Sequence, residues 1–426
     1  MIERNVDGER SKRAFLVGVR DEKMSPKEAD SLARELIGLV NTLGLEIVCW
    51  ETVHIRENHA RYGIGSGKAE ELAQKAASLE ADCIIFDRDI RPSQQRNWEK
   101  LAEISVIDRQ ELIIQIFASR ARSREAELQI SLARMLHALP RLQHKYIDLA
   151  QQRGGRYGTR GSGETLFETD RRLLERRIRR LEGELEEVKR QRQVQRKQRE
   201  RQGVPVCALV GYTNAGKSSI LNALVPGAEV LVEDKLFATL DPTSRRLELP
   251  LGMQVLLVDT VGFIRRLPHS LVNAFRSTLE EVSRADILIH VLDASDEDVV
   301  GQYETTLSVL RDLNADTIPM LTVLNKIDRL QSLESAENPE TLLRRFPDSV
   351  PVSALERKGL TELCACLEKA LSGDKVQLRF PSDRTDLAAQ VHRCGQVFSE
   401  KYGENHIEME ARLDKRSAGR LREYLV

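Results

Sequence analysis

A glycine-rich octapeptide near the middle of this 426-residue chain constrains its fold more than any other feature. Residues 211–218 read Gly-Tyr-Thr-Asn-Ala-Gly-Lys-Ser and fit the pattern G-x-x-x-x-G-K-[ST]. The octapeptide follows an apolar run at 206–210 and opens a helical pattern at 219–224, which is the context of a genuine phosphate-binding loop. Its two glycines let successive backbone N–H groups face a phosphate, which the lysine can neutralise. The chain is therefore predicted to contain an α/β P-loop domain.

Three short blocks follow this loop, each after an apolar strand pattern. Residues 259–262 read Asp-Thr-Val-Gly, so a carboxylate can face a magnesium shell and a glycine N–H can reach a γ-phosphate. Residues 325–328 read Asn-Lys-Ile-Asp, and this aspartate can accept hydrogen bonds from the guanine N1–H and exocyclic amine. Residues 353–355, Ser-Ala-Leu, would close the base pocket. Four blocks in this order predict a GTP- and GDP-binding enzyme that hydrolyses GTP with Mg²⁺.

The segment 236–243 lies where the first switch of such a domain belongs. Thr239 is the predicted second magnesium ligand beside Ser218, with Thr243 as the competing choice. The predicted nucleotide ligands are Gly211, Tyr212, Thr213, Asn214, Ala215, Gly216, Lys217, Ser218, Ser219, Phe237, Ala238, Thr239, Leu240, Asp241, Asp259, Thr260, Val261, Gly262, Asn325, Lys326, Ile327, Asp328, Ser353, Ala354 and Leu355.

Phe263 stands where many small GTPases carry a glutamine that orients the attacking water. Hydrolysis is therefore expected to be slow unless another group or a docked partner helps, and no catalytic residue is assigned. Arg265 and Arg266 are candidate donors, although a solvent-facing or partner-binding pair is the favoured interpretation. Asn214 suggests another source of charge, because an asparagine there could coordinate a potassium ion that bridges the phosphates.

Residues 1–120 alternate β-like runs with helical stretches, which predicts a small parallel α/β domain. The β-like runs are 14–19, 46–50, 83–86 and 104–107, with a helix near 26–43. The sequence Gly63-Ile64-Gly65-Ser66-Gly67-Lys68 could be a second phosphate loop that binds ATP. Its spacing is wrong for a Walker A motif, so a turn or helix cap is the favoured interpretation.

Residues 121–202 have the composition of a helical hairpin. Two heptad-like apolar stripes, at 128–142 and 174–188, predict helices packed along one seam, and the intervening 153–164 contain five glycines. The second arm carries 13 basic and seven acidic residues over 170–201. A solvated helix face could explain these charges, but contact with RNA phosphates is favoured. The predicted RNA-contacting residues are Arg153, Arg156 and Arg160.

The remaining features concern chain organisation and location. The switch domain is expected at 203–372 and a small α/β domain at 373–426, with a strand at 376–380, a helix near 383–400, a strand at 406–413 and a last helix. No apolar stretch reaches the length of a membrane span and the amino terminus lacks a signal-peptide core, so a cytoplasmic monomer is expected. The six cysteines form no C-x-x-C pair, which argues against a zinc site or a disulfide framework.

The chain resembles the HflX family of GTPases over nearly its whole length. The phosphate loop, Phe237-Ala238-Thr239-Leu240-Asp241-Pro242, Asp259-Thr260-Val261-Gly262-Phe263-Ile264 and Gly161-Ser162-Gly163-Glu164-Thr165 followed by Asp170-Arg171-Arg172 carry the resemblance. It implies a GTPase that binds the large ribosomal subunit and its rRNA, places the hairpin tip near the peptidyl-transferase region, and splits stalled or idle ribosomes under stress. Family members are also linked to ATP hydrolysis or RNA helicase activity through the amino-terminal part.

Two other functions stay open at the level of the sequence. The chain could be an RNA-binding or helicase-like remodelling protein that its GTPase domain regulates. It could also be a metabolic or RNA-modification GTPase that acts through a separate catalytic partner. The hairpin tip distinguishes these alternatives: deletion of residues 154–163 should abolish ribosome splitting and leave guanine-nucleotide affinity intact.

Overall fold

The computed structural model describes residues 12–152, 162–200, 204–227, 235–240, 242–266, 276–330, 339–371, 375–403, 405–413 and 415–426. The chain divides into two compact units. One contains Met1–Glu187 with Arg266–Phe275, and the other contains Val188–Arg265 with Arg276–Val426. Both units combine helices with β-sheets, so the predicted α/β fold class is confirmed.

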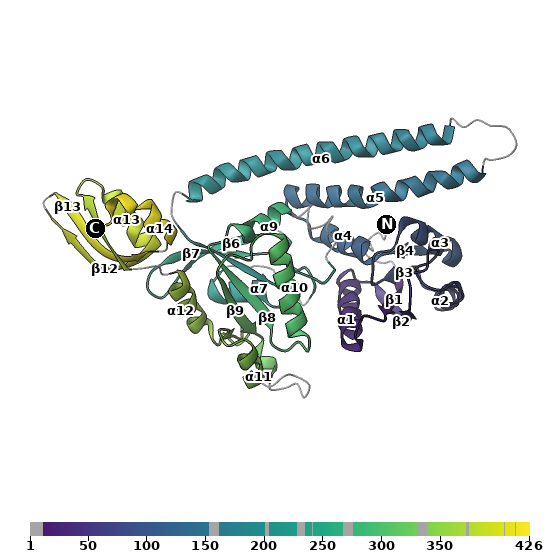
Figure 1. Ribbon diagram of the computed structural model, residues 1–426, viewed down its shortest axis with the longest axis horizontal. Coiled ribbons are helices and arrows are strands. Elements are labelled where there is room, and N and C mark those ends of the chain that lie inside the picture. Colours follow the sequence, from purple (N-terminus) through teal and green to yellow (C-terminus); the bar gives the residue numbers. More distant parts are fainter. Residues whose placement is uncertain are drawn as a thin grey trace. The chain divides into compact units, whose positions relative to one another are not determined.

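The amino-terminal part is a four-stranded parallel sheet with helices around it (Figure 1). The strand order is β2-β1-β3-β4, and the strands are β1 (Arg13–Asp21), β2 (Glu46–Ile55), β3 (Cys83–Phe86) and β4 (Ser105–Ile107). The accompanying helices are α1 (Pro26–Thr42), α2 (Ser66–Ser78), α3 (Pro92–Ala102) and α4 (Arg109–Arg120). The strands β1 and β3 are almost entirely buried because helices cover both faces of a parallel sheet.

Two long helices follow, α5 (Arg124–Gln152) and α6 (Ser162–Glu200). The apolar stripes predicted from the sequence supply buried side chains on both helices, including Leu128 and Leu132 of α5 and Ile178 and Leu185 of α6. The side chains of Arg124 and Glu184 join the helices through an ion pair of 3.9 Å. Helix α5 also packs against α3 and α4, where the Arg141 guanidinium donates to the buried Asp108 carboxylate at 2.6 Å.

The predicted switch domain contains a six-stranded sheet in the order β10-β9-β8-β5-β7-β6. All neighbouring strands are parallel except β6 and β7. The strands are β5 (Val206–Gly211), β6 (Thr243–Glu248), β7 (Gln254–Asp259), β8 (Ile287–Asp293), β9 (Met320–Asn325) and β10 (Val350–Pro351). The helices are α7 (Lys217–Leu224), α9 (Arg276–Ser283), α10 (Val299–Asp312), η1 (Ile327–Arg329), α11 (Pro339–Arg345) and α12 (Leu360–Leu371). Cys364 and Cys366 lie on α12 and pack against the core of this sheet.

The carboxy-terminal part is a three-stranded antiparallel sheet in the order β11-β13-β12. Its elements are β11 (Lys375–Pro381), α13 (Thr385–Cys394), β12 (Gly395–Tyr402), β13 (His406–Leu413), α14 (Lys415–Arg420) and η2 (Arg422–Tyr424). The helix predicted over 383–400 is wrong beyond residue 394. Gly395 takes an extended backbone against Leu413 and Arg412, and the residues after it pair with β13 instead of continuing the helix.

None of the helices in the described parts of the chain is long and apolar enough to cross a membrane.

Candidate functional site

The phosphate loop leaves the carboxyl end of β5, which is flanked on both sides by parallel strands. Its first glycine, Gly211, has φ +146°, and a side chain there would collide with the carbonyl oxygen of Val291 in β8. The second, Gly216, has φ +93° and would collide with the Asn325 amide. Both positions therefore require glycine, because a Cβ would be strained and would displace the neighbouring strand ends. With glycine at these two positions, the backbone can turn from the end of β5 into the start of α7.

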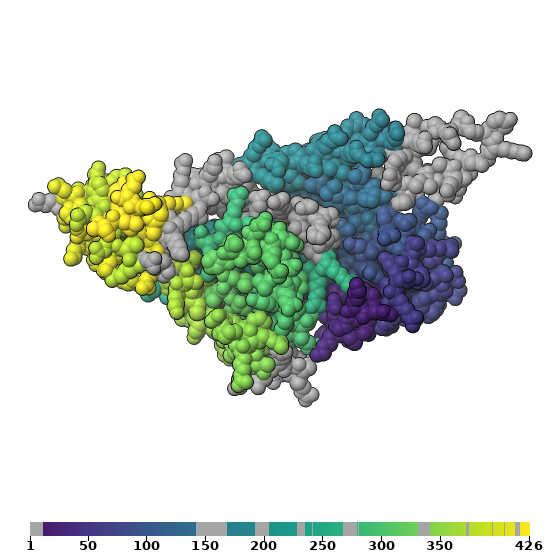
Figure 2. Space-filling view, viewed as in Figure 1, coloured from purple at the N-terminus to yellow at the C-terminus, as the bar shows by residue number. Residues whose placement is uncertain are grey.

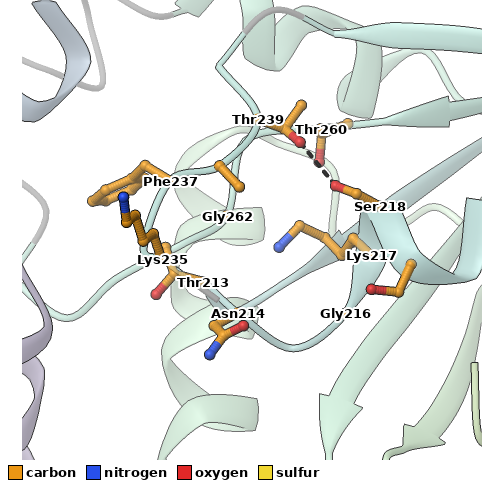
Figure 3. A pocket seen from close by; sticks show the side chains of 12 residues that line it. Thr213, Asn214, Gly216, Lys217, Ser218, Lys235, Phe237, Thr239, Thr260 and Gly262 are labelled. Atoms are coloured by element: carbon orange, nitrogen blue, oxygen red, sulfur yellow. Dashed lines mark hydrogen bonds between the residues drawn. The ribbon is translucent and has the colours of Figure 1, made fainter. Parts of the chain in front are cut away.

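Lys217 is the first residue of α7 and is 7% exposed. Its ammonium donates to the carbonyl oxygens of Gly211 at 3.2 Å and Tyr212 at 2.8 Å, so it reaches back across the loop (Figure 3). Burial lowers the pKa of Lys217 to about 8, against the opposing attraction of the Asp259 carboxylate. A buried ammonium with few compensating charges is suited to receive an anionic phosphate.

A hydroxyl and carboxylate cluster lies beside this lysine. The Ser218 hydroxyl donates to Asp259 Oδ2 at 2.5 Å and lies 2.8 Å from the Thr239 hydroxyl, which itself donates to the same carboxylate oxygen at 3.1 Å. Asp259 is fully buried, burial raises its pKa, and its Oδ1 has no hydrogen-bond partner among the described residues.

Such oxygens are the ligands that Mg²⁺ prefers, and a buried carboxylate with an unpartnered oxygen fits a site that is completed by a cation. Ser218 and Thr239 would ligate the ion, with Asp259 beside them. Thr243, the competing choice, begins β6 and pairs with Asp259 through the backbone ladder of β6 and β7.

The first switch segment lines the same pocket through Phe237, Ala238 and Thr239. Phe237 is buried in a left-handed conformation with φ +57°, and Leu240 is also buried. Asp241 lies outside the described residues. The pocket is also lined by Lys235, which belongs to no recognised sequence motif (Figure 3). Its amine adds a second positive charge to a pocket that already contains the lysine of the phosphate loop.

The block at 259–262 contacts the phosphate loop and the strand before it. The Thr260 hydroxyl donates to the Leu209 carbonyl at 2.6 Å, which fixes the strand end. A Cβ on Gly262 would lie 2.8 Å from Thr213 Cα and 3.0 Å from the Lys217 ammonium, so the backbone of this glycine is packed against the loop. Val261 is buried beside it. This arrangement places the glycine where its N–H could meet a γ-phosphate.

Phe263 is 1% exposed and its backbone pairs with Tyr212 of the phosphate loop. The aromatic ring is therefore buried in the domain, and its side chain has no group that could hold a water. The Arg265 guanidinium forms an ion pair with Asp298, with only 14% of the arginine side chain exposed. The interpretation of Arg265 as solvent-facing is therefore wrong, while Arg266 is exposed. Asn214 lines the pocket with a left-handed backbone at φ +61°.

The predicted base-recognition residues meet at the ends of β9 and β10. The Asn325 amide donates to the Ala215 carbonyl at 2.9 Å, and its oxygen accepts from the Ala354 N–H at 3.1 Å. The Ser353 hydroxyl donates to Asp328 Oδ1 at 2.5 Å. Asparagine thereby links the phosphate loop to the base pocket, while serine orients the aspartate that would face guanine.

The remaining predicted nucleotide-binding residues have different environments. Lys326 pairs with Asp293 at the end of β8 at 2.7 Å, a partner that no motif indicated. Leu355 is 82% exposed, so its side chain lies away from the interior, and Ile327 is partly buried. Ser219 lines the phosphate pocket together with Thr213, Asn214, Gly216, Lys217 and Ser218 of the loop.

The second glycine-rich sequence has a different environment. Gly65 precedes α2 without a side-chain cap, and the Lys68 ammonium on the first turn bonds to Glu71 at 2.5 Å. This is the cap geometry that its sequence favoured, and an open hollow beside it is lined by His54, Arg56 and His59. The predicted RNA contacts Arg153, Arg156 and Arg160 lie outside the described residues.

Among the described residues, no group of three or more histidine, cysteine, aspartate or glutamate side chains could hold a metal ion. The candidate magnesium site therefore depends on hydroxyl ligands around a single carboxylate, together with oxygens that a nucleotide would bring.

Three family models match the chain in succession. They are described as GTP-binding GTPase N-terminal over residues 30–118, GTP-binding GTPase Middle Region over 120–199, and 50S ribosome-binding GTPase over 206–326. The matches therefore include the helical hairpin as well as the nucleotide-binding domain.

Several proteins are similar to this chain over most or all of its length. The GTPase HflX of Akkermansia muciniphila is 46% identical over 435 residues, which is 100% of this chain and 99% of that protein. The GTPase HflX of Caldanaerobacter subterraneus subsp. tengcongensis is 41% identical over 97% of this chain and 94% of that protein, and that of Escherichia coli K12 is 41% identical over 86% of each. A solved GTP-binding protein from Sulfolobus solfataricus in complex with GDP is 24% identical, with a TM-score of 0.45, and the match covers 84% of this chain and 98% of that one.

Proposed function

Because the chain belongs to the HflX family of GTPases, we propose that its GTP hydrolysis drives a cycle of binding to the large ribosomal subunit and splitting of stalled or idle ribosomes in the cytoplasm. The chain itself is a GTP-binding enzyme that hydrolyses GTP. The observation that carries the ribosomal part is the match of residues 206–326 to a family model described as 50S ribosome-binding GTPase, and full-length similarity to HflX proteins extends the family match through the hairpin.

The surface of α6 supports an RNA partner. Its described side chains from 168 to 191 cover a strip of surface in the space-filling view (Figure 2). The exposed arginines on this strip are Arg171, Arg172, Arg176, Arg177, Arg179, Arg180 and Arg190. Some are partly neutralised along the helix, as in the pairs Arg171–Glu175 and Arg180–Glu184. Surface pairs of this kind contribute little and exchange readily for phosphate contacts.

GTP hydrolysis at the nucleotide site would require groups that the chain does not itself supply, namely Mg²⁺, a potassium ion and the ribosomal partner. Bound Mg²⁺ would neutralise charge on the β- and γ-phosphates, held by Ser218 and Thr239. Lys217 supplies the fixed cation, and Gly262 supplies a backbone donor. Phe263 is buried and has no polar group, so another group must position the attacking water. We propose that a potassium ion at Asn214 and the ribosomal partner supply it.

The proposal predicts that large subunits stimulate GTP turnover. Turnover would be measured with and without purified subunits for the native chain, for Arg176→Gln/Arg177→Gln/Arg179→Gln, and for Glu182→Gln on the same helix. Loss of the arginines should weaken subunit binding and reduce the slope of log affinity against log salt by about 2 to 3. The glutamate variant should bind at least as well as the native chain.

The alternative functions give different outcomes. A protein that chiefly remodels RNA would unwind or anneal duplexes with little stimulation by subunits, and an ATPase site at Gly63–Lys68 would show ATP turnover that persists in Lys217→Ala. Unstimulated GTP turnover at saturating subunit concentration would contradict the ribosomal proposal while leaving the GTPase assignment intact.

A further inference from the structure

Backbone hydrogen bonds join the phosphate loop to the segment that begins with residues 259–262 and continues to Arg265, which we call the second switch. The Phe263 N–H donates to the Gly211 carbonyl at 3.0 Å, and the Thr213 N–H donates to the Phe263 carbonyl at 2.8 Å. Tyr212 and Phe263 are partners in a parallel bridge between these two bonds. The bridge continues β5 beyond its carboxyl end and ties residue 263 to the phosphate loop.

The side chain of Tyr212 adds a further contact, two residues beyond Phe263. The phenol oxygen of Tyr212 accepts a hydrogen bond from the backbone N–H of Arg265 at 3.0 Å. Tyr212 is 5% exposed, and Ile264 between the two bonded residues is 1% exposed. The phosphate loop therefore binds the second switch at two places, through the backbones of Gly211 and Thr213 at residue 263 and through the side chain of Tyr212 at residue 265.

The other end of Arg265 is anchored on α10. Its guanidinium pairs with Asp298, the residue that precedes this helix. Gly301, in the first turn of α10, leaves room for this ion pair, because a Cβ there would collide with Arg265 Nη2 and lie 2.5 Å from Asp298 Oδ1. Glycine is unfavourable inside a helix, so its presence here is explained by this packing.

Gly262 directly precedes Phe263, the first of these anchored residues. Its backbone packs closely against Thr213 and the Lys217 ammonium, because a Cβ added at this position would lie within 3.0 Å of both. It is also the residue whose N–H would meet the γ-phosphate of GTP. GDP has no γ-phosphate and would not use that donor. Any change in the position of Gly262 should therefore affect GTP more than GDP.

We propose that Tyr212 is a positioning residue for GTP: its phenol oxygen, with the Arg265–Asp298 pair on α10, holds the second switch so that Gly262 is preorganised for the γ-phosphate. Because these contacts already hold the second switch in place, binding of the γ-phosphate does not have to overcome the conformational entropy of ordering a mobile loop. The site can therefore distinguish GTP from GDP. This role of Tyr212 rests on the GTPase activity of this site and is independent of the ribosomal role.

The test compares Tyr212→Phe, which removes one oxygen, with Tyr303→Phe as a control. Tyr303 belongs to the same domain and stacks on His290, a contact that a phenylalanine ring can keep. The dissociation constants of GDP and of a non-hydrolysable GTP analogue would be measured by titration at one pH and salt concentration. Tyr212→Phe should weaken the analogue about fivefold, the value of one neutral hydrogen bond, and leave GDP affinity within about twofold. The control should change neither.

A second pair of variants tests the anchor on α10. Gly301→Ala should reduce the preference for the GTP analogue over GDP, and the same substitution in an Arg265→Ala background should have a smaller effect, because only Asp298 of the two colliding side chains remains. Equal losses of GDP and analogue affinity in Tyr212→Phe would show a merely structural role and overturn the proposal. Unchanged affinities for both nucleotides would overturn it as well.

Discussion

Lys217 gives nucleotide affinity a pH dependence that follows from its burial. Burial lowers its pKa to about 8, so the free protein begins to lose this positive charge within an accessible pH range. A bound phosphate would favour the charged form and return the pKa of Lys217 toward its ordinary value near 10.5. Binding is then coupled to proton uptake, and affinity falls as the pH rises through about 8 because the free lysine must first be protonated.

The magnitude follows from the fraction of charged lysine. If only the protonated form binds, the dissociation constant of GDP should rise about threefold between pH 7.5 and 8.5, whereas a lysine of ordinary pKa would leave it unchanged. Stopping at pH 8.5 keeps the guanine N1 proton in place. Calorimetry at pH 8 in two buffers of different ionisation enthalpy should detect uptake of about half a proton per GDP bound.

Lys235→Gln is the matched control, because it removes the other lysine of the same pocket. This variant should bind GDP more weakly at every pH but keep the threefold change. A flat affinity profile for the native chain, with no buffer-dependent heat, would refute the claim that the buried lysine is partly neutral before the nucleotide binds.

Three more predictions concern individual residues of the site. Asp328→Asn should weaken GTP by at least tenfold, corresponding to about 1.4 kcal/mol, and favour xanthosine nucleotides; unchanged GTP affinity in a competition titration would argue against this base pocket. Gly211→Ala should lower the free energy of unfolding by about 2 kcal/mol or more in a urea titration, because its Cβ meets the Val291 carbonyl; native stability would contradict the packing. Asn214→Ala should abolish any excess of GTP turnover in potassium over sodium chloride, and equal rates in the native chain would remove the potassium hypothesis.

The sequence predicted the nucleotide-binding sheet well because its key geometry is local. The glycine spacing of the phosphate loop can be recognised from adjacent residues, and it predicts the positive φ found at Gly211 and Gly216, whereas the close approach of Val291 to Gly211 cannot be recognised in this way. Asp259 and Asn325 can likewise be recognised, since each ends a strand of a parallel sheet and such ends converge at one edge.

The residues that the sequence did not indicate depend on tertiary contacts. Asp293 has no motif of its own and matters only because β8 places it beside Lys326. Tyr212 occupies a variable position of the loop pattern, and its bond to the Arg265 backbone joins segments 53 positions apart. Gln396 to Tyr402 could form either helix or strand by local preference, and pairing with β13 selects the strand.

Light scattering of intact ribosomes mixed with this protein tests the central claim most directly. The account predicts that scattering falls when the chain is added with a non-hydrolysable GTP analogue, as the particles separate into subunits, and stays constant when the chain is added with GDP. Constant scattering with the analogue, under conditions where the chain is shown to be bound to the large subunit, would contradict it.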